Sequence, residues 1–326
     1  MVISSEFFAD ASQAAIRQAV HDLDPERIHV LVTLRPLARI LASQWQQYVQ
    51  SGMRTGYQNW LEAMLGDERT TITPTFWRRH RHDQLIRRWA DALGPSRVTA
   101  IVLDRTDRRF VLRAMERLLG LPAETLPLIR DARNRSLTLA EVETLRAFNI
   151  AFRDANLSPA LLSRVVQWGA ARYIKAWPPA SDEGRICTPT WAAERASQIA
   201  HEMVASIAES GVNVIGDLDG LLAGPDPVAD KPPAAEISPE IAARVAMGVL
   251  AAAGVAPLPS DGTSPTGWRG PEPLALSQMT TVEVLAALPP RIARLGIRGW
   301  RGLRTRMRSM TGQGVPSADE EETADA

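Results

Sequence analysis

The sequence predicts an α/β fold in which helices flank a parallel β-sheet. Four short, mostly apolar runs alternate with helical patterns, and their apolar residues are largely consecutive rather than confined to every second position. Continuous apolarity is typical of strands in a parallel sheet that is covered on both faces, and alternation of strands with helices favours this class. The predicted strands are Met1–Ser4, Ile28–Leu34, Val98–Leu103 and Val212–Ile215.

Helical periodicity fills the segments between and after these runs. Pro36 is typical of a first helical position, so a helix is expected directly after the second strand. Thr138 followed by Glu141 is a capping-box pattern, which predicts another helix start. The predicted helices are Ala9–Leu23, Pro36–Ser51, Phe76–Leu93, Arg108–Leu119, Leu139–Arg153, Leu161–Ile174 and Thr190–Glu209.

The composition changes after about residue 222, and we expect the α/β domain to span residues 1–222. Residues 223–290 are rich in Pro, Gly and Ala and predict a linker with short helices over about 238–253 and 281–288. Residues 291–326 are basic over 291–308 and acidic at the end, which predicts a largely disordered tail.

Charge and cysteine content narrow the function classes. The 326 residues carry a formal charge of +0, so no overall field favours nucleic acid, and no nucleic-acid partner is predicted. Cys187 is the only cysteine, which excludes an intrachain disulfide and a Cys-based zinc cluster; no metal site is predicted. No signal peptide and no stretch of about 20 apolar residues is visible, so a cytoplasmic protein is expected.

Arg35, Arg39 and Ser43 follow the second predicted strand at spacing i, i+4, i+8. A helix that begins at Pro36 would place them near one face of its first two turns. Two guanidinium groups and a hydroxyl beside the carboxyl end of a strand make a plausible phosphate cradle. From spacing alone, an ordinary strand-to-helix turn with solvent-exposed arginines is the alternative.

The segment around Arg35 resembles a known family. Thr33-Leu34-Arg35-Pro36-Leu37, followed by Ser43, is similar to the 3′-phosphate-binding segment of sulfotransferases that use 3′-phosphoadenosine 5′-phosphosulfate (PAPS), in which Ser follows Arg by eight residues. Here the proline follows the arginine directly, a small departure from the family's pattern. The resemblance implies that Arg35 and Ser43, with Arg39 beside them, hold the 3′-phosphate of PAPS as co-substrate.

Further segments extend this resemblance across about residues 1–222, in the order expected of bacterial sulfotransferase-like proteins with a P-loop type of sheet. Asn134-Arg135-Ser136-Leu137 looks like their Asn-x-Ser-Leu segment, which implies that Asn134, Arg135 and Ser136 contribute to the nucleotide site. The alternative is that Ser136 or Thr138 caps the following helix. The other matching segments are Val2–Glu6, Arg88–Thr99 and Val214–Asp219.

One part of the family pattern is missing. The family's fold begins with a strand and a Gly-rich loop with Lys and Ser or Thr, which cradles the 5′-phosphosulfate, whereas the first lysine here is Lys175. The resemblance starts at the second strand, as though roughly 60–90 residues of a first βα unit were absent upstream. We expect a truncated gene model in preference to a lost site, because losing a central strand would expose strand edges.

Glu6, His80 and His82 are three further side chains of types that can serve in catalysis. Sulfuryl transfer needs a base for the acceptor proton, and Glu6 stands at the end of the first predicted strand. The alternative, that Glu6 caps the following helix, is as well supported. His80 and His82 are spaced i, i+2 within one predicted helix, so we expect them on a solvated basic face rather than in a site.

The resemblance implies transfer of a sulfuryl group from PAPS to a hydroxyl or amine of a carbohydrate or lipid-linked acceptor. Whether this chain, without the phosphosulfate loop, is active stays open. The alternative is a non-catalytic scaffold that keeps the fold and docks on an anionic membrane or an acidic partner through its basic tail, residues 291–308. A disordered tail without a membrane role competes with this peripheral contact.

Overall fold

The computed structural model describes residues 2–66, 72–104, 106–128, 135–179, 183–231 and 233–257. It contains two compact units, Met1–Val249 and Leu250–Ala326. The first unit holds the sheets and nearly all the described helices. The tail over 291–308, the predicted helix near 281–288 and Asn134 lie outside the described residues.

A three-stranded parallel sheet forms the α/β part of the first unit. Its strands are β1 (Val30–Leu34), β2 (Val98–Val102) and β4 (Asn213–Ile215), in the order β1-β2-β4. Leu34 pairs with Val102, and Ile101 pairs with Ile215. The carboxyl ends of all three strands therefore meet at one edge of the sheet, which is where parallel α/β folds carry ligand sites.

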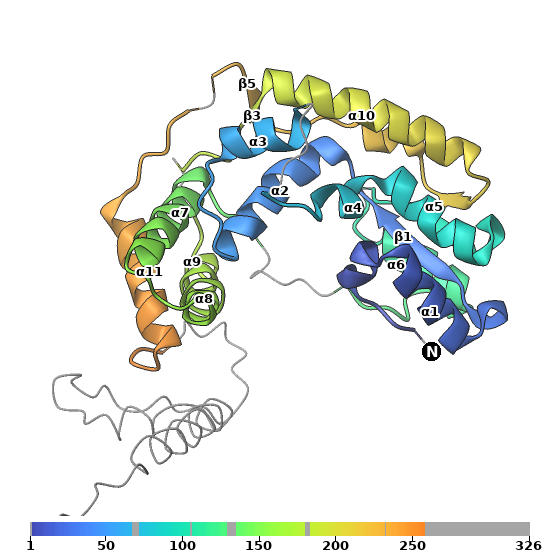
Figure 1. The fold of residues 1–326 in the computed structure, drawn as a ribbon, viewed down its shortest axis with the longest axis horizontal. Helices are drawn as coiled ribbons and strands as arrows, with labels where there is room; N and C mark the ends of the chain where they lie inside the picture. Colours follow the sequence, from blue (N-terminus) through green and yellow to red (C-terminus); the bar gives the residue numbers. More distant parts are fainter. Residues whose placement is uncertain are drawn as a thin grey trace, which may run out of the picture. The chain divides into compact units, whose positions relative to one another are not determined.

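Helices from distant parts of the sequence cover one face of this sheet. They are α1 (Gln13–Leu23), α5 (His82–Leu93) and α10 (Thr190–Glu209) (Figure 1). Their apolar stripes pack on the strands because burial of apolar area is the main driving force for folding. The shared core contains Ile16, Val20, Leu34, Leu85, Ile86, Trp89, Val98, Ala100, Val102, Ile207 and Leu221.

A second helical group carries the aromatic part of the core. It contains α2 (Leu37–Gln50), α3 (Tyr57–Leu65), α4 (Phe76–His80) and α7 (Leu139–Asp154). The fully buried Trp45 packs on Tyr57 with ring centroids 5.0 Å apart, and the fully buried Trp60 packs on Phe76 at 5.3 Å. α2 contacts α3, α7 and α10, so it links both helical groups.

The other described elements are a second, smaller sheet and further helices. Thr188–Pro189 (β3) and Val228–Ala229 (β5) form a separate two-stranded parallel sheet. The predicted helix over Leu161–Ile174 is composite: α8, the π-helical segment η5 and α9 follow one another. The bounds of these and the other helices are Phe110–Leu119 (α6), Pro159–Leu162 (α8), Ser163–Ala170 (η5), Ala171–Lys175 (α9) and Pro239–Ala252 (α11).

The predicted first strand, Met1–Ser4, is wrong. Val2 and Ile3 are 58% and 54% exposed, and the described part of this segment makes no strand pairing. Ser5 instead caps a 3₁₀ helix, η1 (Glu6–Asp10), by accepting from the N–H of Phe7. Phe8 then packs edge-on against Trp89, so the segment is held by aromatic contacts instead of a β-ladder.

The predicted helix over Phe76–Leu93 is broken at Arg81, where ψ is 82°. The chain leaves helical geometry for one residue and starts again as α5. The two helices have separate buried faces, and this break determines where the side chains on either side of it point.

Gly216 lets the chain leave β4 in close contact with the end of β2. Its φ is +102°, and a Cβ there would lie 2.9 Å from the carbonyl oxygen of Val102. Any other residue would combine an unfavourable backbone conformation with a collision against the neighbouring strand.

In the described part of the chain, no helix has the length and apolarity needed to cross a membrane.

Candidate anion site at the end of strand β1

Arg35 stands where strand β1 turns into helix α2. Leu34 is fully buried, whereas Arg35 is exposed at the carboxyl edge of the sheet. Its guanidinium forms no hydrogen bond or ion pair with any residue that the structure describes. Pro36 occupies the N-cap position of α2 and gives no side-chain cap. An unpaired arginine therefore lies beside an uncapped helix N-terminus, two features that attract anions.

Arg39 and Ser43 lie on the first two turns of α2, and both have intramolecular partners. The Nε of Arg39 donates to the carbonyl oxygen of Gly224 at 2.9 Å. The Ser43 hydroxyl donates to the carbonyl oxygen of Ile40, also at 2.9 Å. A phosphate that used Ser43 as a donor would have to take its proton from this bond within the helix. Of the three predicted residues, Arg35 is the one with an unused guanidinium among the described contacts.

The expectation of a solvated face is wrong for His82, which is buried, and His80 is half-buried with its Nε2 shielded from solvent. His80 follows the fully buried Phe76 by four residues, and their rings lie 4.8 Å apart. His82 precedes the fully buried Ile86 by four residues and is 5% exposed. The break at Arg81 thus turns both rings inward, with centroids 6.4 Å apart. The signal in the sequence was the i, i+4 spacing within two short helices, which a single long helix conceals.

Both histidines are held neutral. Burial, followed by the charges of His82, Arg79 and Arg35, lowers the pKa of His80 to about 3. Burial lowers the pKa of His82 to about 4; Asp83 opposes this shift and Arg35 adds to it. The charge of Arg35 acts on both rings, so the histidines and the strand end share one electrostatic environment.

The other charged groups near the histidines are paired. Arg79 donates from Nε to the Oδ2 of Asp10 at 2.6 Å, and a second ion-pair contact joins the same two residues. Arg81 forms a two-pronged contact with Asp83, with N–O distances of 3.0 and 2.9 Å. Burial would raise the pKa of Asp83, but the hydrogen bonds and charge of Arg81 outweigh it and lower that pKa overall.

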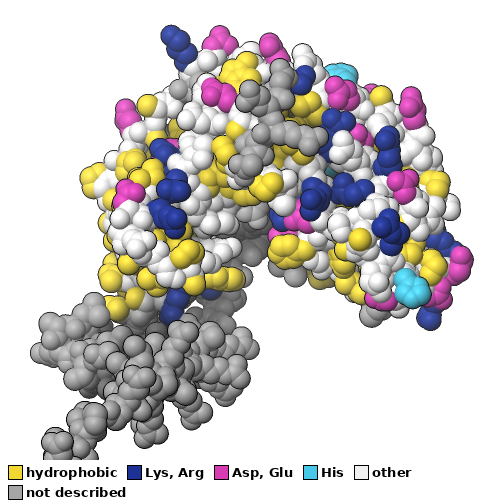
Figure 2. Space-filling model, in the orientation of Figure 1, with side chains coloured by type: hydrophobic (Ala, Val, Ile, Leu, Met, Phe, Trp, Pro, Cys, Tyr) yellow, Lys and Arg dark blue, Asp and Glu magenta, His cyan; other side chains and the backbone are white. Residues whose placement is uncertain are grey.

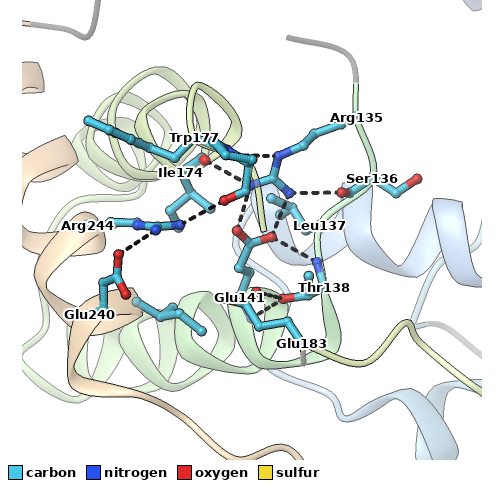
Figure 3. Close-up of polar contacts among 12 residues, drawn as sticks. Arg135, Ser136, Leu137, Thr138, Glu141, Ile174, Trp177, Glu183, Glu240 and Arg244 are labelled. Carbon is cyan, nitrogen blue, oxygen red and sulfur yellow. Dashed lines mark hydrogen bonds and ion pairs between the residues drawn. The ribbon is translucent and has the colours of Figure 1, made fainter. Parts of the chain in front are cut away.

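Arg135 lies in a closed hydrogen-bond network (Figure 3). Its guanidinium makes five hydrogen bonds, which equals the five N–H donors that an arginine has. Two of them join the carboxylate of Glu141, which is fully buried, at 2.8 and 2.6 Å. The other three go to the carbonyl oxygens of Ser136, Ile174 and Trp177.

The capping box predicted from Thr138 and Glu141 is confirmed, and it is part of the same network. The Thr138 hydroxyl accepts from the N–H of Glu141 at 3.2 Å, and the Glu141 carboxylate accepts from the N–H of Thr138 at 2.8 Å. Thr138 is the N-cap, so Ser136 is not. The N–H of Leu137 donates to the side chain of Gln46, one turn beyond Ser43 on α2. The 135–138 loop therefore packs against α2.

Glu6, the candidate base, is exposed and is the first residue of the 3₁₀ helix η1. The N-cap of η1 is Ser5 and that of the following helix α1 is Ser12, so the alternative that Glu6 caps the following helix is wrong. The charge of Glu6 acts on Arg79, which places the carboxylate near the Arg79–Asp10 pair.

A polar groove of about 690 Å³ opens near the C-terminal end of α2. Its lining includes Tyr48, Ser51, Arg54, Asn59, Thr73 and Arg146. Tyr48 joins this groove to the arginine-rich region, because the charges of Arg79 and Asp10 act on its phenol; burial is the main reason that its pKa is raised.

Figure 2 shows several Lys and Arg side chains, in dark blue, over the part of the molecular surface that α4 and the end of β1 occupy in Figure 1.

Among the described residues, no group of three or more His, Cys, Asp or Glu side chains has an arrangement that could hold a metal ion. Comparison with protein-family models, with curated proteins and with solved structures finds no match to this chain. The sheet, the free guanidinium at its edge and the buried histidines beside it are therefore the basis for assigning a function.

Proposed function

We propose that the chain binds a 3′-phosphorylated adenine nucleotide at the end of β1, as part of a sulfotransferase of the P-loop type. The observation that carries this proposal is the unpaired guanidinium of Arg35 beside the uncapped N-terminus of α2. An arginine fork and helix N–H groups are suited to a phosphate monoester. The order of the parallel sheet, which brings three strand ends to this edge, supports the same position for a ligand.

The proposed reaction transfers a sulfuryl group from PAPS to an acceptor hydroxyl or amine. The sulfur–oxygen bond of the phosphosulfate breaks, a new bond forms from sulfur to the acceptor atom, and a base takes the acceptor proton. Adenosine 3′,5′-bisphosphate is the second product. Arg35 would hold its 3′-phosphate, whereas the lysine loop that would hold the phosphosulfate is not in this sequence.

A carbohydrate or lipid-linked acceptor remains our proposal for the second substrate. The groove near α2 is lined by a hydroxyl, an amide and an arginine, Ser51, Asn59 and Arg54, which are groups that hydrogen-bond to sugar hydroxyls. We place the protein in the cytoplasm, on the basis of its single, buried cysteine.

Calorimetric titration with adenosine 3′,5′-bisphosphate tests the proposal. Wild-type protein should bind it more tightly than adenosine 5′-monophosphate, which lacks the 3′-phosphate. Arg35→Ala should weaken binding of the bisphosphate by about 10- to 100-fold, since a charged hydrogen bond contributes about 1.5–3 kcal/mol. Arg17→Ala removes an exposed arginine from α1 and serves as the control.

Equal binding of the bisphosphate by wild type and Arg35→Ala would refute the assignment of Arg35. No binding by the wild type, in a protein whose circular dichroism shows the expected helix content, would refute the nucleotide site itself. Loss of binding in Arg17→Ala as well would point to a general charge effect instead of a site.

A further inference from the structure

The buried histidines beside Arg35 have unused hydrogen-bonding atoms. The Nδ1 of His82 and the Nε2 of His80 are buried without a hydrogen-bond partner among the described residues. His82 is only 5% exposed, and it is the first residue of α5, a helix of 12 residues. A buried polar atom without a partner costs free energy, so its presence at a helix start beside a charged edge calls for a functional explanation.

Several charged groups surround the two rings, and most of them are paired; the exposed Glu6 of η1 acts on Arg79 without an ion pair among the described residues. From η1, Asp10 reaches Arg79 of α4. At the start of α5, Arg81 holds Asp83 and also contacts Glu202 of α10 at 3.3 Å.

Two further groups complete these surroundings. Tyr48 of α2 is a neutral phenol within reach of the Arg79 and Asp10 charges. Arg35, at the end of β1, is a cation that acts on both histidines and has no carboxylate partner among the described residues. An external anion would supply the missing negative charge.

We propose that Arg35, His80 and His82 form one proton-coupled anion site, in which a phosphate monoester bound by Arg35 draws protons onto the buried rings. This inference rests on the proposed nucleotide site and adds two residues and a regulation to it. In the empty protein, burial and the nearby arginines keep both rings neutral. A bound dianion reverses the sign of the local field, and the low polarity of the interior strengthens that effect.

Linkage then fixes the direction of the pH effect. If the anion raises the pKa of the histidines, the protein takes up protons when the anion binds, and a lower pH strengthens binding by the same coupling. The phosphate's own protonation acts in the opposite direction. The coupling must therefore be measured against a variant that lacks the histidines and meets the same ligand at the same pH.

The test is calorimetry of the full chain at pH 6.0 in two buffers of different ionisation enthalpy, which gives the number of protons taken up per ligand. Adenosine 3′,5′-bisphosphate and inorganic phosphate are titrated separately. With each ligand, wild type should take up at least about half a proton more per ligand bound than the His80→Asn/His82→Asn variant. Arg35→Ala should lose binding and proton uptake together.

A second measurement needs no histidine variant. Nitrogen-15 spectra of the imidazole rings in wild-type protein report the two titration midpoints directly. Inorganic phosphate should raise at least one of these midpoints by about two units or more, which is the increase that half a proton of uptake at pH 6.0 requires, and Arg35→Ala should abolish the increase. Midpoints that stay in place while the ligand binds would overturn the coupling.

The outcomes separate this inference from the proposed function. Binding of the bisphosphate without excess proton uptake overturns the coupling and leaves the nucleotide site standing. Proton uptake with inorganic phosphate, together with binding of the bisphosphate no tighter than that of adenosine 5′-monophosphate, supports the anion site and refutes the nucleotide site. Failure of both ligands to bind refutes both proposals.

Discussion

Arg35 and Arg135 are the same residue type, and the same resemblance assigned both to the nucleotide, yet they have opposite surroundings. Arg35 is exposed, and its guanidinium makes no hydrogen bond or ion pair with the described residues. Arg135 uses all five of its N–H donors within the protein, two of them on the buried Glu141. A ligand needs donors that the fold leaves unused, so the first arginine suits binding and the second suits stability.

The partners of each arginine explain the difference. Glu141 is fully buried at the start of α7, and a buried carboxylate is very costly without a cation. Arg135 provides that cation and also satisfies three carbonyl oxygens. The carboxylates that act on the two histidines, Asp10 and Asp83, already have arginines of their own. Nothing in the described structure requires Arg35 for folding.

The largest expected effect is on the stability of Arg135→Ala. Removing this guanidinium leaves Glu141 buried and uncompensated, so the free energy of unfolding should fall by about 3 kcal/mol. Arg35→Ala should change it by less than about 0.5 kcal/mol, as for an ordinary surface substitution. Urea unfolding followed by circular dichroism measures both. Similar losses for the two variants would break the comparison.

The second largest expected effect is a fall in stability at low pH caused by the two histidines near Arg35. The pKa of His80 is lowered to about 3 and that of His82 to about 4, so below about pH 6.5 the unfolded chain binds protons that the folded chain does not. The free energy of unfolding should therefore fall by about 1 kcal/mol for each histidine between pH 7 and 5.5.

The matched variant for this pH effect is His80→Asn/His82→Asn. Its urea-derived stability should fall less steeply over the same pH range than that of the wild type, whatever its absolute value. Parallel curves for the two proteins would show that the rings are not held neutral in the folded state.

A smaller effect is expected at the N-cap of α7. Thr138→Ala removes the hydroxyl that accepts from the N–H of Glu141 and should lower the free energy of unfolding by about 1 kcal/mol. Thr138→Ser keeps the cap and should recover most of that loss. An unchanged stability in Thr138→Ala would indicate that the Arg135–Glu141 contact alone holds this end of the helix.

The smallest expected effect is that of Ser43→Ala on nucleotide binding. The Ser43 hydroxyl already donates to Ile40, so its net gain from a phosphate is limited to an exchange of bonds. We expect adenosine 3′,5′-bisphosphate to bind about 2- to 3-fold more weakly, corresponding to about 0.5 kcal/mol. A loss as large as that of Arg35→Ala would mean that Ser43 is a principal ligand.

The sequence predicted those parts of the fold in which local pattern and burial agree. β1 and β2 have continuous apolar runs, and α10 has the predicted bounds, Thr190–Glu209, because one apolar stripe runs along its length. Met1–Ser4 has the same local pattern as the strands, but Val2 and Ile3 gain no ladder partner among the described residues. A run of apolar residues indicates a strand only where a neighbour in space completes it.

The candidate site was only half visible in the sequence. The position of Arg35 followed from a strand end next to a proline, both of which are local signals. The burial of His80 and His82 depends on a one-residue break at Arg81, which no proline or glycine marks. Likewise, the five hydrogen bonds of Arg135 go to four residues in two segments, 136–141 and 174–177, so its structural role depends in part on tertiary contacts that spacing does not encode.

The most direct test of the central claim is a cycle that pairs one deletion in the protein with one in the ligand. Wild type, Arg35→Ala and Arg135→Lys are each titrated with adenosine 3′,5′-bisphosphate and with adenosine 5′-monophosphate. The 3′-phosphate and Arg35 should show a coupling free energy of about 1.5 kcal/mol or more, whereas Arg135 should show a value near zero. Coupling to Arg135 with none to Arg35 would contradict the account.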